Sequence, residues 1–216
     1  MPLHFHQHIL PVGELGIWKI EENEAYFLEQ LLLSPSEQEQ LARIKGRRRV
    51  EWLASRQLVH YMSGRKERAV FVKDEFGKPH LQGSAFDISI SHSHGLAAGI
   101  AAPLPVGIDI QAIVTRIERI AHKFVRPEEA AMLRADTRIV HLHAYWGAKE
   151  ALYKAYGRRQ LDFCQHILVE PFEYLPQGGH FQASIRKGHF SASYTLHYQL
   201  MDGFMLVYAM EIEKQI

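Results

Sequence analysis

Residues 145–157 of this chain read Tyr-Trp-Gly-Ala-Lys-Glu-Ala-Leu-Tyr-Lys-Ala-Tyr-Gly. Alanine, leucine, lysine and glutamate dominate the stretch and no proline interrupts it, so the sequence predicts a helix that ends at Gly157. At about 100° per residue, Glu150 lies on a face that also carries aromatic side chains, with Lys149 and Lys154 at its edges. The simpler interpretation is a surface pair of Glu150 and Lys154. The mixed polar face also fits a functional site.

The composition limits the classes of protein to consider. The chain has 216 residues, of which 47% are hydrophobic, and its formal net charge is +1, which favours no acidic or basic partner. Its one cysteine, Cys164, excludes an internal disulfide and a cysteine-rich zinc site. We find neither a signal peptide nor an apolar run of the ~18 residues that a membrane span needs. These features predict a soluble cytoplasmic protein that does not enter a membrane.

Alternating and helical patterns divide the chain near residues 103–105, where two prolines occur. We therefore expect an N-terminal lobe of residues 1–104 and a C-terminal lobe of residues 105–216. Ser34, Pro35 and Glu37 form a helix start signal, with a cap, a first-turn proline and a capping-box glutamate. The expected strands are 14–20, 69–72, 86–92, 96–102, 106–111, 167–172, 180–186, 191–200 and 204–212. The expected helices are 22–33, 35–44, 50–62, 116–124, 127–134 and one from about 137 to 156.

A basic segment lies within twelve residues of the N-terminal half. Its cations are Lys45, Arg47, Arg48, Arg49 and Arg56. A solvated basic face is the common explanation of such a run. A multiply phosphorylated ligand is the functional one, because arginine binds phosphate through paired hydrogen bonds. The same run is also typical of a nucleic-acid patch.

Asp109 and Glu150 are the carboxylates that suggest chemistry. Asp109 shares a strand face with Gly107, which permits another backbone or a ligand to approach closely. Two carboxylates with nearby cations suit Mg²⁺, which proteins usually hold with one or two carboxylates and substrate phosphates. The sequence therefore favours a pyrophosphate or nucleotide ligand, although an isolated aspartate on a strand is more often structural.

Four motifs together resemble a known family. They are Phe-Gly-Lys-Pro at 76–79, Ile-Ser-Ile-Ser-His-Ser at 88–93, Val-Gly-Ile-Asp-Ile at 106–110, and Trp-Gly-Ala-Lys-Glu-Ala-Leu-Tyr-Lys at 146–154. Their order and spacing are similar to those of the 4′-phosphopantetheinyl transferases, in the longer, surfactin-synthetase-activating type. The first 75 residues match only loosely, through the basic helix.

The resemblance implies an α+β fold of two similar α/β lobes in a pseudo-twofold arrangement, each with an antiparallel sheet packed on a long helix. It implies an active site at the interface of the lobes, where coenzyme A binds with Mg²⁺. The implied reaction moves the 4′-phosphopantetheine arm of coenzyme A onto a serine of an apo acyl or peptidyl carrier protein and releases adenosine 3′,5′-bisphosphate. Because both lobes belong to one chain, we expect a monomer.

Residue by residue, the resemblance assigns Asp109 and Glu150 to the metal and Lys154 to the pyrophosphate. Metal and Lys154 would stabilise charge that develops on the pyrophosphate, and Glu150 or a metal-bound water would take the serine proton. Asp109, Glu150 and Lys154 are thus the expected catalytic residues. The expected coenzyme A contacts are Lys78, Ser91, His92, Lys154, Arg56 as a looser match, and Arg49 from the basic segment.

The chain departs from the family at Gln111, where the longer type usually has glutamate. Position i+2 on a strand shares the face of Asp109, so we expect Gln111 to reach the ion through its amide oxygen or a water. The loss of one anionic ligand leaves open a preference for Mn²⁺. Two other functions are considered: a coenzyme A-binding homologue that has lost catalysis, and a nucleic-acid-binding protein that uses residues 45–56. The pI of about 8.0 does not support the second.

Overall fold

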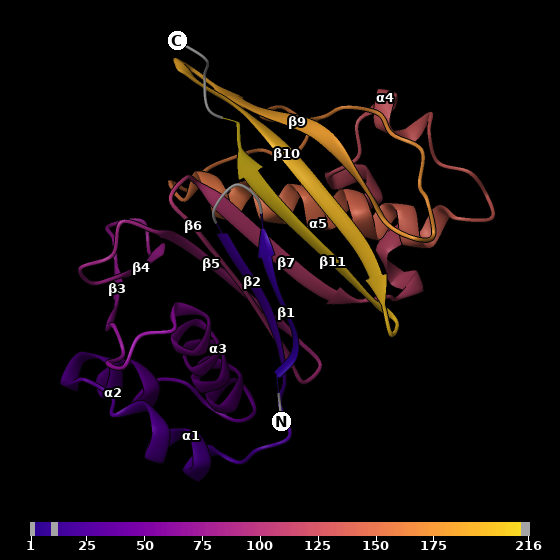
Figure 1. Cartoon of the computed structure of the whole chain (residues 1–216). Helices are drawn as coiled ribbons and strands as arrows, with labels where there is room; N and C mark the ends of the chain where they lie inside the picture. Colours follow the sequence, from indigo (N-terminus) through magenta and orange to yellow (C-terminus); the bar gives the residue numbers. More distant parts are fainter. Residues whose placement is uncertain (1–2, 10–12, 213–216) are drawn as a thin grey trace. The chain divides into compact units, whose positions relative to one another are not determined.

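The computed structural model describes residues 3–9 and 13–212. The chain divides into residues 1–103 and residues 104–216, which we call unit 1 and unit 2. Each unit contains one antiparallel sheet and its own helices (Figure 1). The predicted α+β class with two antiparallel sheets is therefore confirmed. No helix among the described residues is long and apolar enough to cross a bilayer.

The sheet of unit 1 has the strand order β1-β2-β6-β5-β4-β3, and the long helix α3 packs on β2, β5 and β6. Helix α1 packs on α3, and apolar residues such as Phe27, Leu53 and Leu58 are buried among these elements. The elements are β1 (Leu3–Ile9), β2 (Gly13–Lys19), α1 (Glu24–Leu31), α2 (Pro35–Ala42), α3 (Arg48–Ser63), β3 (Phe71–Lys73), β4 (Pro79–Leu81), β5 (Asp87–Ser93) and β6 (Leu96–Ala102).

The sheet of unit 2 has the order β7-β11-β10-β9-β8, and the long helix α5 packs mainly on β7 and β11. Helix α5 ends at Gly157, which takes the left-handed conformation expected from the sequence (φ 70°). The elements are β7 (Val106–Ala112), η1 (Thr115–Lys123), α4 (Pro127–Ala130), α5 (Arg138–Tyr156), β8 (Ile167–Val169), β9 (Gly179–Lys187), β10 (Phe190–Met201) and β11 (Phe204–Glu211).

The two units share one topology. In each, a first strand (β2 or β7) leads to a long helix and then to four antiparallel strands, the last of which pairs with the first strand. In each, a glycine of the first strand lies directly under the long helix. A Cβ added at Gly16 would be 2.7 Å from Met62 Sδ, and one at Gly107 would be 1.8 Å from the Ala151 carbonyl oxygen. The expected similarity of the two halves is confirmed, and Gly107 permits close backbone approach as predicted.

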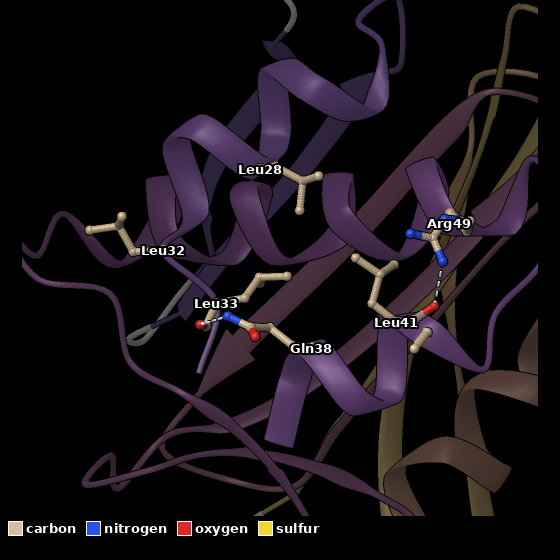
Figure 2. A pocket seen from close by; sticks show the side chains of 7 residues that line it. Leu28, Leu32, Leu33, Gln38, Leu41 and Arg49 are labelled. Carbon is tan, nitrogen blue, oxygen red and sulfur yellow. Dashed lines mark hydrogen bonds between the residues drawn. The ribbon is translucent and has the colours of Figure 1, made fainter. Parts of the chain in front are cut away.

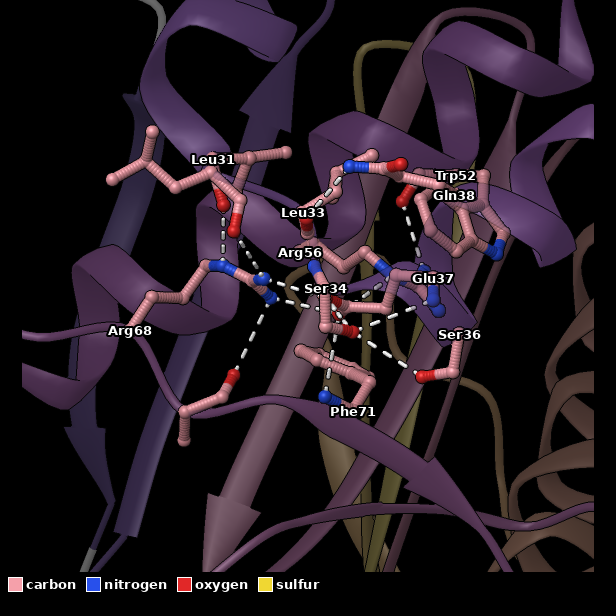
Figure 3. A network of polar contacts seen from close by, with 12 residues as sticks. Leu31, Leu33, Ser34, Ser36, Glu37, Gln38, Trp52, Arg56, Arg68 and Phe71 are labelled. Carbon is pink, nitrogen blue, oxygen red and sulfur yellow. Dashed lines mark hydrogen bonds and ion pairs between the residues drawn. The ribbon is translucent and has the colours of Figure 1, made fainter.

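The capping box predicted at residues 34–37 is present and belongs to a buried polar network (Figure 3). The Glu37 carboxylate accepts hydrogen bonds from the Ser34 backbone, at 3.0 Å, and from the Phe71 backbone, at 3.3 Å. Arg68 donates two hydrogen bonds to it, at 2.8 and 2.6 Å. These donors, chiefly Arg68, outweigh the effect of burial and lower the pKa of Glu37 to about 2. The network ties α2 to the start of β3.

A few boundaries differ from the predicted ones. The strand expected at 167–172 ends at Val169, because Pro171 cannot donate a ladder hydrogen bond. The segment 116–124 forms a 3₁₀ helix rather than an α-helix. In β5, polar and apolar residues alternate, which is typical of a strand with one solvent-facing side, but the polar Ser89 and Ser91 are both buried, with exposed fractions of 3% and 7%.

His141 of α5 makes unit 2 sensitive to acid. Its ring stacks on Tyr145 at 4.8 Å and contacts Phe172, and neither ring nitrogen has a hydrogen-bond partner among the described residues. Burial lowers the pKa of His141 from 6.5 to about 4. The unfolded chain therefore binds a proton at higher pH than the folded chain does, so stability falls as the pH drops from 6.5 toward 4.

Because of this histidine, we expect the free energy of unfolding to fall by about 2 kcal/mol when the pH is lowered from 7 to 5. His141→Phe keeps an aromatic ring in the same surroundings and removes the titration. Urea unfolding at both pH values should show a shallower pH dependence in the variant. Equal pH dependence in the two proteins would contradict the expectation.

Candidate active site

Asp109 and Lys154 meet where β7 packs against α5. Lys154 Nζ donates hydrogen bonds to Asp109 Oδ1, at 2.9 Å, and to the Ile108 carbonyl oxygen, at 2.8 Å. The close approach of the two elements at Gly107 brings this lysine within reach of the strand. The carboxylate is buried, with 7% of the residue exposed. The structure thus brings together two of the predicted site residues, which are 45 residues apart in sequence.

Glu150 lies one helical turn before Lys154 and is half-buried. Burial raises the pKa of its carboxyl group, the nearby Asp109 charge raises it further, and Lys154 opposes both. A carboxylate with a raised pKa is a better proton acceptor near neutral pH. Asp109, Glu150 and Lys154 therefore form one cluster, which we call the carboxylate–lysine cluster.

Gln111 borders this cluster and is bound to His143 of α5. Gln111 Nε2 lies 3.2 Å from Asp109 Oδ2 and 3.3 Å from the His143 carbonyl oxygen. Gln111 Oε1 lies 2.9 Å from His143 Nδ1. The amide oxygen that we expected to reach a metal is thus engaged by a histidine, which the sequence analysis had not singled out.

The cluster fits a divalent cation with few protein ligands. Two carboxylates, Asp109 and Glu150, are within electrostatic reach of one another, as the raised pKa of Glu150 indicates. In the part of the chain that the structure describes, no group of three or more histidine, cysteine, aspartate or glutamate side chains is arranged to hold a metal. Mg²⁺ commonly takes only one or two carboxylates and completes its shell with water and substrate phosphates. The donor set therefore suits Mg²⁺ held jointly with a phosphorylated substrate.

Lys149 precedes Glu150 but points into the core of unit 2. Its Nζ is 2.7 Å from Glu129 Oε1 and from the Ile167 carbonyl oxygen, and 3.1 Å from the Phe163 carbonyl oxygen. The side chains of Lys149 and Glu129 are both fully buried. Glu129 also caps α4 and accepts from the Val169 backbone, as Glu37 does for β3 in unit 1. Lys149 thus has a structural role.

In unit 1, Lys78 and Ser91 are both largely buried. Lys78 Nζ lies 2.7 Å from Asp87 Oδ2, and the Asp74 carboxylate accepts from the Lys78 backbone at 2.8 Å. The turn before β4 therefore holds Lys78 against β5. Ser91 is 7% exposed in the same strand.

His92 is joined to the basic segment through Glu51 of α3. His92 Nδ1 is 3.1 Å from Glu51 Oε2, and Arg47 Nε is 3.9 Å from Glu51 Oε1. The Arg47 guanidinium also lies over Gly95, in the turn that follows His92. A histidine of one motif and an arginine of the basic segment thus share the Glu51 carboxylate. Glu51 gave no signal in the sequence, because its contacts depend on how α3 packs beside β5.

Arg56 and Arg49 lie elsewhere in unit 1. Arg56 is 2% exposed, and its guanidinium lies 3.2 Å from the Trp52 ring centroid and faces Glu37 at 3.8 Å. Burial lowers its pKa to about 9. Arg49 is paired with Glu24 and donates to the Leu41 carbonyl oxygen at 2.6 Å. Neither set of contacts supports a role in binding coenzyme A, which stays a prediction for both arginines.

Arg49 also borders the cavity shown in Figure 2, which has a volume of about 510 Å³. The cavity lies between α1 and α2 of unit 1, and its other lining residues are mostly apolar: Leu28, Leu32, Leu33, Gln38, Leu41 and Ala42. None of these is a predicted site residue. The expectation that the active site lies at the interface of the two units also stays a prediction.

Comparison with known proteins supports the family resemblance. Residues 105–208 match the family model of the 4′-phosphopantetheinyl transferase superfamily. The 4′-phosphopantetheinyl transferase gsp of Aneurinibacillus migulanus is 31% identical over 113 residues, which cover 50% of this chain and 46% of that protein. The chain thus matches about half the length of this curated relative. The segment matched by the family model contains the whole carboxylate–lysine cluster. Residues 105–208 of this chain are thus similar to the 4′-phosphopantetheinyl transferase superfamily, which is the family that the motifs resemble.

Proposed function

We propose that this protein transfers the 4′-phosphopantetheine arm of coenzyme A to a serine of an acyl or peptidyl carrier protein, with Mg²⁺ as cofactor. The observation that carries the proposal is the carboxylate–lysine cluster, which lies within the segment that matches the family model. A buried aspartate, a half-buried glutamate with a raised pKa, and a lysine beside both are suited to phosphoryl transfer. Proton removal and charge stabilisation are the two tasks of that reaction.

In the proposed reaction, the serine Oγ attacks the phosphorus that carries the pantetheine group. The bond from that phosphorus to the bridging oxygen of the pyrophosphate breaks, and adenosine 3′,5′-bisphosphate leaves with the electron pair. Glu150 takes the serine proton. Lys154, fixed by Asp109 and the Ile108 carbonyl oxygen, places a positive charge beside the pyrophosphate. Mg²⁺, held by Asp109 and Glu150, would neutralise further negative charge on the phosphates.

We further propose that unit 1 supplies contacts to the nucleotide. The Arg47 guanidinium and the His92 ring, which both contact the Glu51 carboxylate, supply hydrogen-bond donors suited to a phosphate monoester, such as the 3′-phosphate of coenzyme A. Lys78 and Ser91 provide a second charged group and a hydroxyl. These groups act remotely from the reacting phosphorus, so they position the substrate and do not take part in the chemical step.

We expect Lys78→Ala and His92→Ala each to raise the KM for coenzyme A by about tenfold or more, because a charge-assisted hydrogen bond is lost. The kcat should stay within a few-fold of the wild-type value, since these contacts are as strong in the ground state as in the transition state. Steady-state kinetics at varied coenzyme A concentration measures both. Lys66→Ala, which removes an exposed lysine of the same unit, is the control. A large fall in kcat with unchanged KM would contradict the assignment.

The direct test is mass spectrometry of apo carrier proteins after incubation with this protein, coenzyme A and Mg²⁺. A mass gain of one phosphopantetheine on a carrier serine supports transfer, and the panel should include carriers of fatty acid, polyketide and peptide synthesis. Coenzyme A binding without any mass gain would favour the catalytically degenerate homologue. A gel shift with bulk nucleic acid and a steep salt dependence would favour a nucleic-acid-binding function of residues 45–56.

A further inference from the structure

We propose that His143 and Gln111 are positioning residues for Asp109, and that Gln111 acts through its amide NH₂ group and not as a metal ligand. The inference rests on the proposed function, since it describes how the metal-binding carboxylate is oriented. It differs from the expectation that the Gln111 oxygen reaches the ion. The chain of contacts runs from the Val114 backbone through His143 and Gln111 to Asp109.

The tautomer of His143 follows from the Gln111 amide. His143 Nε2 lies 3.0 Å from the Val114 backbone nitrogen and 3.1 Å from the Val114 carbonyl oxygen, so the Val114 contacts are compatible with either tautomer. Gln111 Nε2, however, lies beside two acceptor oxygens, of the Asp109 carboxylate and the His143 carbonyl group, so Gln111 Oε1 faces the ring and the proton lies on Nδ1. Nδ1 is 2.9 Å from Gln111 Oε1, which accepts it. His143 is only 1% exposed, and burial, its main influence, lowers its pKa and favours this neutral form.

The Nδ1–H group of His143 then stabilises this orientation of the Gln111 amide. With its oxygen bound to His143 Nδ1, the amide directs Nε2 toward Asp109 Oδ2, at 3.2 Å, and the His143 carbonyl oxygen, at 3.3 Å. The flipped amide would place its oxygen beside the Asp109 carboxylate and beside the His143 carbonyl oxygen. Both contacts would be repulsive, so the side chain has one favoured orientation.

The result is an aspartate held on both sides. Lys154 donates to Asp109 Oδ1 and Gln111 donates to Oδ2, so rotation of the carboxylate is restricted. Such contacts orient a metal ligand. Their loss typically lowers metal affinity or activity by about 10–100-fold. Asp109 and Glu150 remain as the carboxylate ligands, and the Gln111 oxygen is withdrawn from the ion.

The experiment measures Mn²⁺ affinity by electron paramagnetic resonance on the full chain without coenzyme A. His143→Leu should weaken Mn²⁺ binding by about tenfold, because the Gln111 amide is no longer fixed. His143→Asn restores a side-chain N–H near the position of Nδ1 and should recover affinity to within about threefold of wild type, since it keeps the donor to Gln111. Both variants lose the acceptor for the Val114 N–H, so they differ mainly in the donor to Gln111.

His141→Leu is the matched control for loss of a buried histidine. His141 belongs to the same helix and is also 1% exposed, but no hydrogen bond joins it to Gln111 or Asp109. It should destabilise unit 2 without changing Mn²⁺ affinity by more than about twofold, since the contacts that orient Asp109 are untouched. Equal losses of affinity in His141→Leu and His143→Leu would overturn the proposal. So would a His143→Asn variant as weak as His143→Leu.

Nitrogen-15 NMR of the His143 ring gives a readout that does not depend on activity. We expect a protonated Nδ1 and an unprotonated Nε2 at pH 7 and above, and the opposite tautomer would overturn the proposal. If wild-type protein binds Mn²⁺ and modifies a carrier but the His143 variants match it, the positioning role fails and the proposed function stands. If wild-type protein with the expected tautomer neither binds Mn²⁺ nor modifies a carrier, both the proposed function and the positioning role are contradicted.

Discussion

Glu150→Gln should lower phosphopantetheine transfer by at least ~10²-fold while the thermal midpoint stays nearly unchanged, because loss of a general base typically costs that much or more. Glutamine keeps the shape and the helix propensity of glutamate, so α5 should fold as before. The substitution removes the carboxyl group whose pKa burial raises, and with it the proposed proton acceptor. It also leaves Asp109 as the one carboxylate of the cluster, which should weaken Mg²⁺ binding.

The measurement is carrier modification at saturating Mg²⁺ and coenzyme A, beside thermal unfolding of the same samples. Glu128→Gln removes the charge of an exposed glutamate in unit 2 and is the control, with expected transfer close to wild type. If Glu150 were ordinary helix surface, the variant would lose only the pair with Lys154, worth about 0.2–0.5 kcal/mol of stability. Transfer within a few-fold of wild type would support that interpretation and remove Glu150 from the mechanism.

Much of the local structure was predictable because its signals are local. The start of α2 follows from Ser34, Pro35 and Glu37, whose cap contacts lie within a few residues of one another. The end of α5 follows from Gly157, which takes a left-handed conformation at little cost. Strands β9, β10 and β11 follow from alternation and lie close to their predicted ranges. Each of these features depends on the spacing of apolar residues or on the backbone conformation that a residue type prefers, and both can be read from a single sequence.

Contacts between distant residues were not predictable from such patterns. Periodicity placed Lys149 at the edge of the polar face of its helix, but the structure buries it against Glu129, 20 residues earlier. Arg56 appeared to be one cation of a basic segment, but it packs on Trp52 inside unit 1. In both cases a long side chain points inward to a buried glutamate. Neither the helix period nor the number of charged residues predicts which glutamate that is.

The same limit applies to the candidate site. Asp109 and Glu150 stand out in the sequence as a pair of carboxylates, the family resemblance adds Lys154, and the structure brings the three residues together. Gln111 and His143 are 32 residues apart, and their contact depends on the packing of β7 on α5. From the sequence, Gln111 was only a missing carboxylate. The identity of its partner was needed to see which end of its amide faces Asp109.

Lys149→Met should destabilise the protein by roughly 3–5 kcal/mol, because it leaves the buried Glu129 carboxylate without its charged partner. The two side chains are fully buried and their charged atoms are 2.7 Å apart. Methionine has a similar length and fills the space, so loss of volume is a small part of the cost. The Lys149 hydrogen bonds to the Phe163 and Ile167 carbonyl oxygens are lost as well. Urea unfolding measures the change in free energy.

A double variant separates the effect of the unpaired Glu129 charge from the effect of the lost Lys149 hydrogen bonds. Glu129→Gln removes the negative charge and keeps one acceptor oxygen, for one of the two backbone N–H groups, of Arg126 and Val169, that the two carboxylate oxygens accept from. Combined with Lys149→Met, it should recover about 1–2 kcal/mol relative to Lys149→Met alone, since no uncompensated charge remains buried. Below the unfolding transition, Lys149→Met should retain transfer within a few-fold of wild type, in contrast to Glu150→Gln at the next position. Unchanged stability with lost transfer would instead place Lys149 in the chemistry and remove the ion pair from its structural role.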